Sequence, residues 1–345
     1  MTRRARAVAG TLAALALATA SAGAAEESTV PSDFVNDGNL QVGLGPLRIP
    51  SQSPGQSLRL GILPRTPSNL PVGTWQGFTS ATWVNVWANT EDVHLDYESA
   101  TVSAALAYGL ADGWQVEGEV TMRTTFGGYM DGFIEGFHRT FGIGQDGRTA
   151  APRGQTAIDI SPSSSQPGLH EDNKDLQRDR AYFARGYVEH TLLHGDDLLP
   201  VVALALTAQA PVGHNRLVNG GAVDVGANLA IAKRFGTLVC YTSVAYTRFG
   251  ADTLSGITLH RSNWSGMAAL EYNHNNNASL VVQYLLSQGV APDYHDLSKA
   301  SHEVAIGVKF TTGEATEVEL GVIENLFVFD NSPDFGVHLG VAHRF

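Results

Sequence analysis

Alternation of apolar with small or polar residues is the feature that most constrains the fold of this chain, and it is sharpest at the end of the sequence. The odd positions from 335 to 345 are Phe335, Val337, Leu339, Val341, His343 and Phe345, whereas the even positions are Gly336, His338, Gly340, Ala342 and Arg344. Successive side chains of a β-strand point to opposite faces, so a period of two gives a strand with one apolar face. The segment is therefore predicted to be such a strand, closed by an aromatic residue.

Similar alternation recurs upstream and predicts an all-β chain of about twelve antiparallel strands. The predicted strands are 75–90, 93–110, 114–125, 181–193, 198–210, 222–234, 238–250, 262–273, 278–288, 301–311, 315–327 and 334–345. These segments lack the period of 3.6 that a helix would require. An even number of strands is what single-chain bacterial outer-membrane barrels have. A transmembrane antiparallel β-barrel over residues 75–345 is therefore expected.

The connections between these strands alternate between short and long, which favours a membrane barrel over a secreted β-sandwich. Short turns fall at 111–113, 194–197, 235–237, 274–277 and 312–314, and longer loops at 126–180, 211–221, 251–261, 289–300 and 328–333. Outer-membrane barrels place tight turns in the periplasm and longer loops outside the cell. Only the first hairpin, around Glu91 and Asp92, departs from this alternation.

The N-terminus predicts export. Arg3, Arg4 and Arg6 precede an apolar run over 8–20, and Ala22-Gly23-Ala24 offers small residues for cleavage, so residues 1–24 are expected to be a signal peptide. Its loss would change the formal charge from −12 to −12 − 3 = −15, which argues against nucleic acid as a partner. The expected location is the bacterial outer membrane, with outer-membrane lipid and lipopolysaccharide as neighbours.

Two segments stand outside the alternation. Residues 25–74 are rich in Pro, Gly and Ser, and are expected either to extend into the periplasm or to insert into the barrel lumen. The long extracellular loop 126–180 contains apolar residues at helical spacing, which predict a short amphipathic helix. The residues of this loop helix are Met130, Phe133, Ile134, Phe137 and Phe141. Its apolar face would seal the mouth, contact lipid or bind a ligand.

Two stretches resemble a known family. Gly45-Pro46-Leu47-Arg48, followed by Gln52, Pro54 and the run from Leu63-Pro64 to Gly73, is similar to the N-terminal signature of the domain-of-unknown-function 3187 family. The run from Asp131 to His138, sequence DGFIEGFH, resembles the central motif of that family. The resemblance implies a Gram-negative outer-membrane barrel, and it implies no activity or catalytic residue.

Charged residues on the lumen side of the predicted strands suggest a function. The expected lumen-lining residues are Glu117, Glu119, Arg123, Asp224, Glu303, Lys309, Glu317 and Glu319, and Glu189, Glu271, Arg185 and Arg344 are placed with them. Charge on this scale requires a wet lumen or tight ion pairing. The two interpretations are a narrow, acid-biased and cation-favouring channel for small solutes, and a lumen plugged by salt bridges.

A rim hydrolase acting on lipid or peptide is the alternative from another class. Asp293, His295 and Asp296 lie on a predicted extracellular loop and would activate water there. Exposed Asp and His residues in loops are more commonly only solvated, so we expect no enzyme. No zinc-type Cys/His spacing and no phosphate-binding Gly-rich loop is present, and neither cofactor nor metal is expected.

The last strand predicts a dependence on the barrel-assembly machinery. An alternating terminal strand that ends on an aromatic residue resembles the signal that this machinery reads, here carried by Val341, His343 and Phe345. Deleting Phe345 is expected to lower the yield of folded barrel in the membrane, because the recognised apolar face loses its last side chain. Heat-modifiable migration of the membrane fraction on gels measures this. Normal yields of the folded form after deletion would contradict the prediction.

Overall fold

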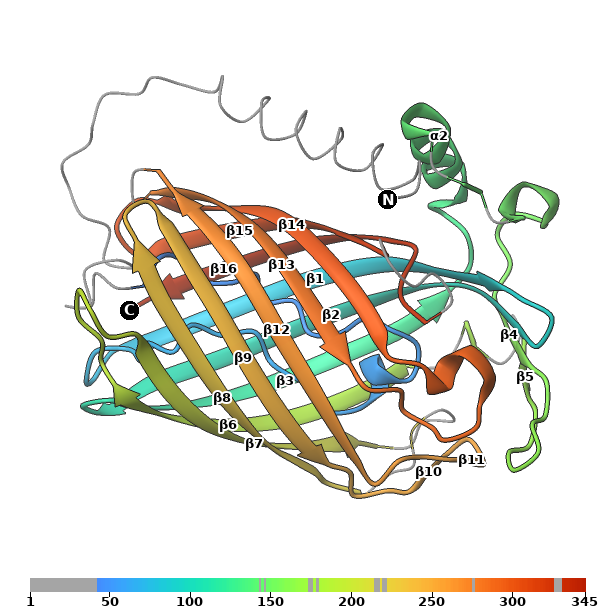
Figure 1. Cartoon of the computed structure of the whole chain (residues 1–345), viewed down its shortest axis with the longest axis horizontal. Coiled ribbons are helices and arrows are strands. Elements are labelled where there is room, and N and C mark those ends of the chain that lie inside the picture. Colours follow the sequence, from blue (N-terminus) through green and yellow to red (C-terminus); the bar gives the residue numbers. More distant parts are fainter. Residues whose placement is uncertain are drawn as a thin grey trace.

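The computed structural model describes residues 42–142, 144–145, 147–172, 176–177, 180–213, 218, 222–274, 277–325 and 331–345; the expected signal peptide lies outside them. Twelve long strands form one closed antiparallel barrel (Figure 1). They are β1 (Trp75–Asn89), β2 (Val93–Ala111), β3 (Trp114–Phe126), β6 (Arg180–Leu193), β7 (Val201–Val212), β8 (Asp224–Phe235), β9 (Leu238–Arg248), β12 (Ser262–Asn273), β13 (Ala278–Ser287), β14 (Ser301–Thr312), β15 (Thr316–Glu324) and β16 (Phe335–Arg344). The described helices include none that is long and apolar enough to span a membrane.

Pairing of the first and last strands closes the barrel. Ser80 of β1 lies opposite Ser103 of β2 on one side and Gly340 of β16 on the other. Every other neighbour along the wall is joined antiparallel, so the barrel has no free edge. The twelve-strand prediction is confirmed, and the predicted strand ends agree with the structure to within three residues.

The outer face of the wall has the character of a lipid-facing surface. Large apolar side chains such as Val120, Leu206 and Val244 are more than half exposed there. Aromatic side chains mark both borders of this apolar band. Near the short turns they are Trp75, Trp114, Phe235, Tyr272 and Phe345, and near the long loops they are Tyr182, Tyr246 and Trp264.

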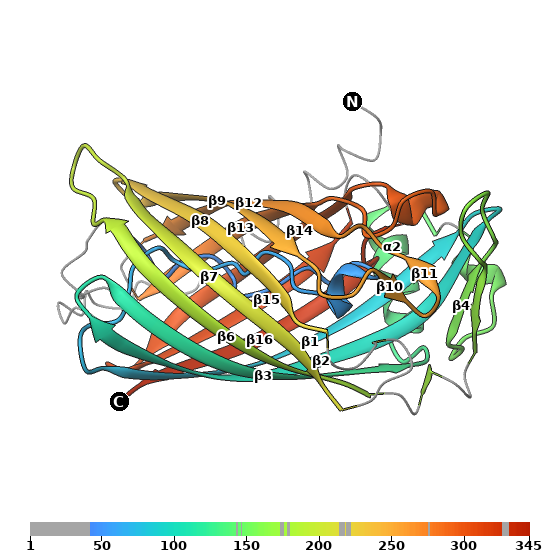
Figure 2. The same cartoon turned by 90° about the horizontal axis from the view of Figure 1, so that it is seen from below.

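Short elements decorate the end that carries the long loops. A hairpin of β4 (Ala157–Ile160) and β5 (Leu169–Glu171) continues the outer end of β2 beyond the barrel (Figures 1 and 2). The other short elements are β10 (Thr253–Leu254), β11 (Ile257–Thr258) and the 3-10 turns η1 (Gln56–Leu58), η2 (Arg148–Ala150) and η3 (His295–Ser298).

The predicted loop helix is present as α2 (Asp131–Phe141), but it packs on the outer wall and not over the mouth. Met130 and Ile134 are buried against Phe335, with Trp83 and Phe137 beside them. Trp83 and Phe335 point away from the lumen, so of the three alternatives for this apolar face the structure excludes sealing of the mouth. Phe133 is 60% exposed although its ring lies 5.4 Å from that of Phe335. The side chain of Phe141 lies outside the described part of the chain.

A buried arginine fixes this loop to the wall. The guanidinium of Arg148 donates to Asp334 Oδ2 at 2.7 Å and to Asn85 Oδ1 at 2.7 Å, and it pairs with Asp131 of α2 at 3.3 Å. Asp131 also accepts a bond from the backbone N–H of Gly154 at 3.1 Å. The first residue of the DGFIEGFH motif therefore holds the helix, the following loop and the wall together.

The alternation of short turns and long loops predicts which end of the barrel faces outward. An epitope tag inserted near Ser164, in the loop between β4 and β5, is expected to bind antibody on intact cells, because that loop projects from the long-loop end. A matched tag at Gly236, in the tight turn between β8 and β9, should bind antibody only after permeabilisation. Immunofluorescence with and without permeabilisation measures both. The reverse pattern would invert the topology.

Candidate functional site: the occupied lumen

Residues 42–70, called the plug from here on, lie inside the barrel (Figure 2). The plug begins at the short-turn end, where Arg234 Nη2 donates to the carbonyl of Val42 at 3.0 Å. It turns at η1, where Gln56 binds the carbonyl of Gln288 at the long-loop end, and it returns to the first end, where Thr191 donates to the carbonyl of Pro67 at 2.9 Å. Of the two placements that the sequence allowed for residues 25–74, residues 42–70 have the one in the lumen, whereas residues 25–41 lie outside the described part of the chain.

The plug forms no strand with the wall, because its prolines interrupt any ladder. They are Pro46, Pro50, Pro54, Pro64 and Pro67. Its backbone N–H groups are bound instead by carboxylates of the wall. Glu271 accepts from Leu44 and Gly45 at 2.9 and 3.1 Å. Glu303 accepts from the N–H of Gln52 at 2.7 Å, and Asp224 accepts from that of Leu60 at 3.1 Å.

Apolar contacts complete the fit of the plug. Leu47, Ile49, Leu60 and Ile62 are at most 1% exposed. Gly321 of β15 faces Leu47 and Ile49. A Cβ atom at this position would lie 3.2 Å from Ile49 Cδ1 and 3.4 Å from Leu47 Cδ1. The absence of a side chain on the wall at this position leaves the space that the plug occupies.

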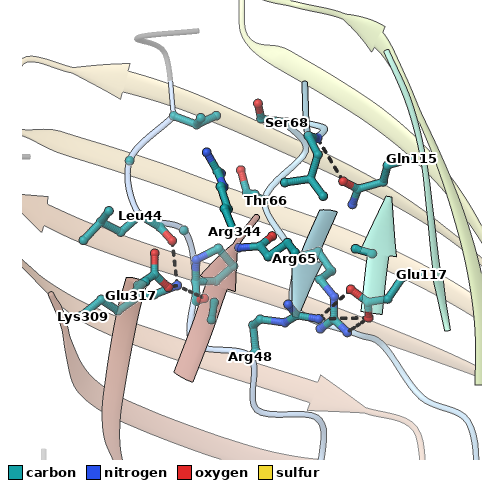
Figure 3. A pocket seen from close by; sticks show the side chains of 18 residues that line it. Leu44, Arg48, Arg65, Thr66, Ser68, Gln115, Glu117, Lys309, Glu317 and Arg344 are labelled. Atoms are coloured by element: carbon teal, nitrogen blue, oxygen red, sulfur yellow. Dashed lines mark hydrogen bonds and ion pairs between the residues drawn. The ribbon is translucent and has the colours of Figure 1, made fainter. Parts of the chain in front are cut away.

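Glu117 of β3 binds both limbs of the plug (Figure 3). Arg48 of the entering limb lies 2.8 Å from its Oε2 atom, and Arg65 of the returning limb lies 2.9 Å from its Oε1 atom. All three side chains are largely or wholly buried, so each charge depends on the others for its stabilisation. This carboxylate thereby joins two parts of the plug that are 17 residues apart (65 − 48).

Arg59, the third arginine of the plug, pairs with a carboxylate other than Glu117, and all three arginines lie over aromatic rings. Arg59 binds Asp224 at 2.9 Å near the long-loop end. The guanidinium carbons of Arg48, Arg59 and Arg65 lie 3.9, 4.3 and 5.8 Å from the ring centres of wall residues. The rings are those of Phe78, Phe249 and Tyr187, in that order, and they add cation–π attraction to the ion pairs.

The eight lumen-lining residues expected from the sequence are all buried on the inner side of the strands. They are Glu117, Glu119, Arg123, Asp224, Glu303, Lys309, Glu317 and Glu319. Lys309 joins Glu317 and Glu319 at 2.9 and 3.3 Å, whereas Arg185 joins Glu119 at 2.7 Å. The wall is therefore ion-paired within itself as well as with the plug.

The charges of the described lumen balance when the plug is included. Eight wall carboxylates point inward: Glu117, Glu119, Glu189, Asp224, Glu271, Glu303, Glu317 and Glu319. Five wall bases join them: Arg123, Arg185, Arg234, Lys309 and Arg344. The wall thus carries 5 − 8 = −3, and the plug carries three arginines and no acidic residue, giving +3. The sequence-based count of four wall bases omitted Arg234.

Sequence reasoning also missed the three plug arginines as lumen residues. A signal was present, because residues 42–74 contain Arg48, Arg59 and Arg65 without any Asp or Glu. A basic segment next to an acid-lined wall favours insertion. Without the fold, however, the same composition fits a segment that binds an acidic surface elsewhere.

The catalytic candidates of the outer loops hold those loops together. His295 Nδ1 lies 3.4 Å from a carboxylate oxygen of Asp92, and its Nε2 atom lies 2.9 Å from the carbonyl of Ser161. Both ring nitrogens are thus engaged. Hydrogen bonds from Ser165, Ser164 and Ser163 hold the pKa of Asp293 below its usual value.

The space left beside the plug is small. One cavity of about 80 Å³ lies near Glu117 and Lys309 and is the pocket drawn in Figure 3. Another of about 50 Å³ lies between η1 and Arg185. Volumes of this size accommodate only a few water molecules. The described residues contain no group of His, Cys, Asp or Glu suited to hold a metal ion.

A closed twelve-strand barrel with an apolar, aromatic-bordered outer face is an outer-membrane β-barrel, here one whose lumen is occupied by its own N-terminal segment. The family model described as "Protein of unknown function (DUF3187)" matches residues 29–345, and the chain belongs to that family. No curated protein matches the sequence.

Solved structures share the architecture. The COG4313 outer membrane channel from Pseudomonas putida F1 is 13% identical with a TM-score of 0.52, over 83% of this chain and 100% of that one. The NanC porin is 10% identical with a TM-score of 0.45, over 78% of this chain and 98% of that one. The KdgM porin in complex with oligogalacturonate is 5% identical with a TM-score of 0.43, over 79% and 99%. At 13% identity the first likeness is one of fold.

The double pairing of Glu117 predicts how the plug is held. Glu117→Gln is expected to speed hydrogen exchange of residues 42–70 by about tenfold or more, because two buried charge-assisted contacts are weakened. Exchange followed by mass spectrometry of the refolded barrel measures this, with the exposed Glu314→Gln as the matched control. Equal exchange in both variants and the wild type would show that the ion pairs do not hold the plug.

Proposed function

We propose that this protein is a channel for small solutes in the Gram-negative outer membrane, closed by the plug and opened when the plug moves. The charge division of the lumen carries the proposal. The wall alone has a net charge of −3, and the plug alone has +3. Two parts that are separately charged and jointly neutral attract each other, yet leave a water-compatible, charged wall when they part.

The attachment of the plug supports movement. No residue of the plug belongs to a strand, so its withdrawal breaks side-chain contacts and leaves the barrel ladder intact. Both limbs enter and leave at the short-turn end. In the proposed topology that end faces the periplasm, from which the segment could be drawn. The channel described for the Pseudomonas putida neighbour is consistent with passage through this architecture.

A plugged barrel without transport is the second candidate, and one observation favours it. Leu47, Ile49, Leu60 and Ile62 are almost fully buried, which stabilises the closed state by the hydrophobic effect. The two candidates differ in whether removal of the plug yields a conducting barrel. The rim-hydrolase alternative gains no support from His295, whose ring nitrogens are both engaged.

Planar-bilayer conductance tests the proposal. Deletion of residues 42–70 is expected to raise single-channel conductance well above that of the full chain. The deleted form should favour cations, since eight inward carboxylates then face five bases. The preference should be largest at low ionic strength and fade as salt shortens the Debye length, which is about 10 Å at 0.1 M.

A variant with substitutions in place of the deletion tests the proposal even if the deleted barrel fails to fold. Arg48→Gln with Arg65→Gln keeps the plug but removes its contacts with Glu117, and it should raise the frequency of opening. Heat-modifiable migration confirms that each form is folded. Folded barrels that stay closed in both variants would establish the sealed, non-transporting barrel in place of the channel.

A further inference from the structure

A cavity of about 100 Å³ opens at the long-loop mouth, where plug and outer loops meet. Its walls are mainly apolar, and its floor is the turn of the plug around Pro54 and Leu58. The apolar lining is Leu95, Ile160, Leu169, Ile257, Leu259 and Leu297. Loops far apart in sequence thus build one apolar pocket on top of the plug. We call it the mouth pocket.

One strong charge borders this apolar space. Arg123 of β3 lines the mouth pocket and is only 5% exposed. Its guanidinium has long contacts to neutral oxygens, 3.4 Å to Thr101 Oγ1 and 3.5 Å to Gln52 Oε1, and it also interacts with Tyr97. Within the described part of the chain it forms no ion pair with a carboxylate.

The carboxylate that acts on Arg123 is already hydrogen-bonded to the plug. Glu303 acts on it electrostatically, but its carboxylate accepts hydrogen bonds from Ser51, Gln52 and Ser53 of the plug. Glu303 therefore stabilises Arg123 only at longer range, and a buried guanidinium without a carboxylate in direct contact is incompletely compensated for its lost hydration. The arrangement is therefore suited to an anion that arrives from outside.

A second polar side chain lines the same pocket. Tyr294, immediately before η3, is 3% exposed, and its hydroxyl has no hydrogen-bond partner in the described structure. Burial raises the pKa of Tyr294 to about 12, so the hydroxyl stays a neutral donor. The mouth pocket is thus bordered by a buried guanidinium without a directly paired carboxylate and by a hydroxyl without a described partner, in otherwise apolar surroundings.

We propose that the mouth pocket binds a small apolar monocarboxylate, its carboxylate on Arg123 and its hydrocarbon body against Leu95, Ile257 and Leu259. This names the substrate class of the channel proposed above and rests on that function. The volume selects for size: because an apolar cavity of about 150 Å³ holds benzene, a cavity of about 100 Å³ is too small for an aromatic ring and suits a short alkyl chain. Because Pro54 and Leu58 form the floor, a bound acid touches the plug directly.

Calorimetric titration of the full-length refolded barrel with butyrate tests the site. Butyrate is expected to bind, and uncharged 1-butanol, of similar size, should bind more weakly by about tenfold or more, since it cannot pair with the guanidinium. Arg123→Gln should remove this preference. Arg153→Gln, which alters an exposed arginine that pairs with Glu135 of α2 and does not line the mouth pocket, is the matched control and should leave it unchanged.

A second variant keeps the inner wall intact. Ile257→Trp, on β11, fills the mouth pocket from the loop side and should abolish binding of both compounds while the barrel stays heat-modifiable. Butyrate binding that survives Arg123→Gln and Ile257→Trp would overturn the site, as would no binding to the wild type at millimolar concentration.

Titration and conductance separate the two proposals. Binding with the expected preference supports the mouth pocket even if the plug-deleted barrel carries no current, a result that overturns only the channel. A plug-deleted barrel that conducts while the full chain does not bind butyrate overturns only the substrate class.

Discussion

The pairing of wall carboxylates with the plug is the interaction on which the rest of this structure depends. Buried charges are tolerated only with partners, and the wall by itself is three bases short. The plug supplies three arginines, two of them to the single carboxylate of Glu117. The same pairing fills the lumen and orders a proline-rich segment, and among the described residues every hydrogen bond between plug and wall involves a side chain.

The width of the barrel explains why a plug is needed. Eight strands enclose an interior that wall side chains fill, whereas twelve enclose a wider one. Here inward glycines such as Gly321 widen it further and receive Leu47 and Ile49. The first part of the long loop after β3 does not cover this opening, because α2 turns outward and packs on Phe335. The mouth is formed by the later part of that loop, which carries β4 and β5, and by the other long loops, which together with the plug create an apolar pocket bordered by Arg123.

Much of the fold was predictable because a β-strand between lipid and lumen must alternate. Strand number, approximate strand ends and the inward orientation of Glu117 and Glu319 all follow from a period of two. The helix from 131 to 141 also followed from spacing, but its packing partner did not. An apolar helix face predicts only that another part of the protein packs on it. Here the packing partners are the wall residues Trp83 and Phe335, which the pairing of strands distant in the sequence brings together.

The sequence by itself determined a closed, lipid-facing barrel with an acid-rich inner wall, because these properties are encoded locally in each strand. Only the tertiary structure decided that residues 42–70 occupy the lumen, that Arg48 and Arg65 share Glu117, and that Arg123 meets an apolar pocket. Such contacts join segments tens to hundreds of residues apart. The geometry of these contacts depends on how the closed barrel positions its strands, and no local pattern of residues encodes that arrangement.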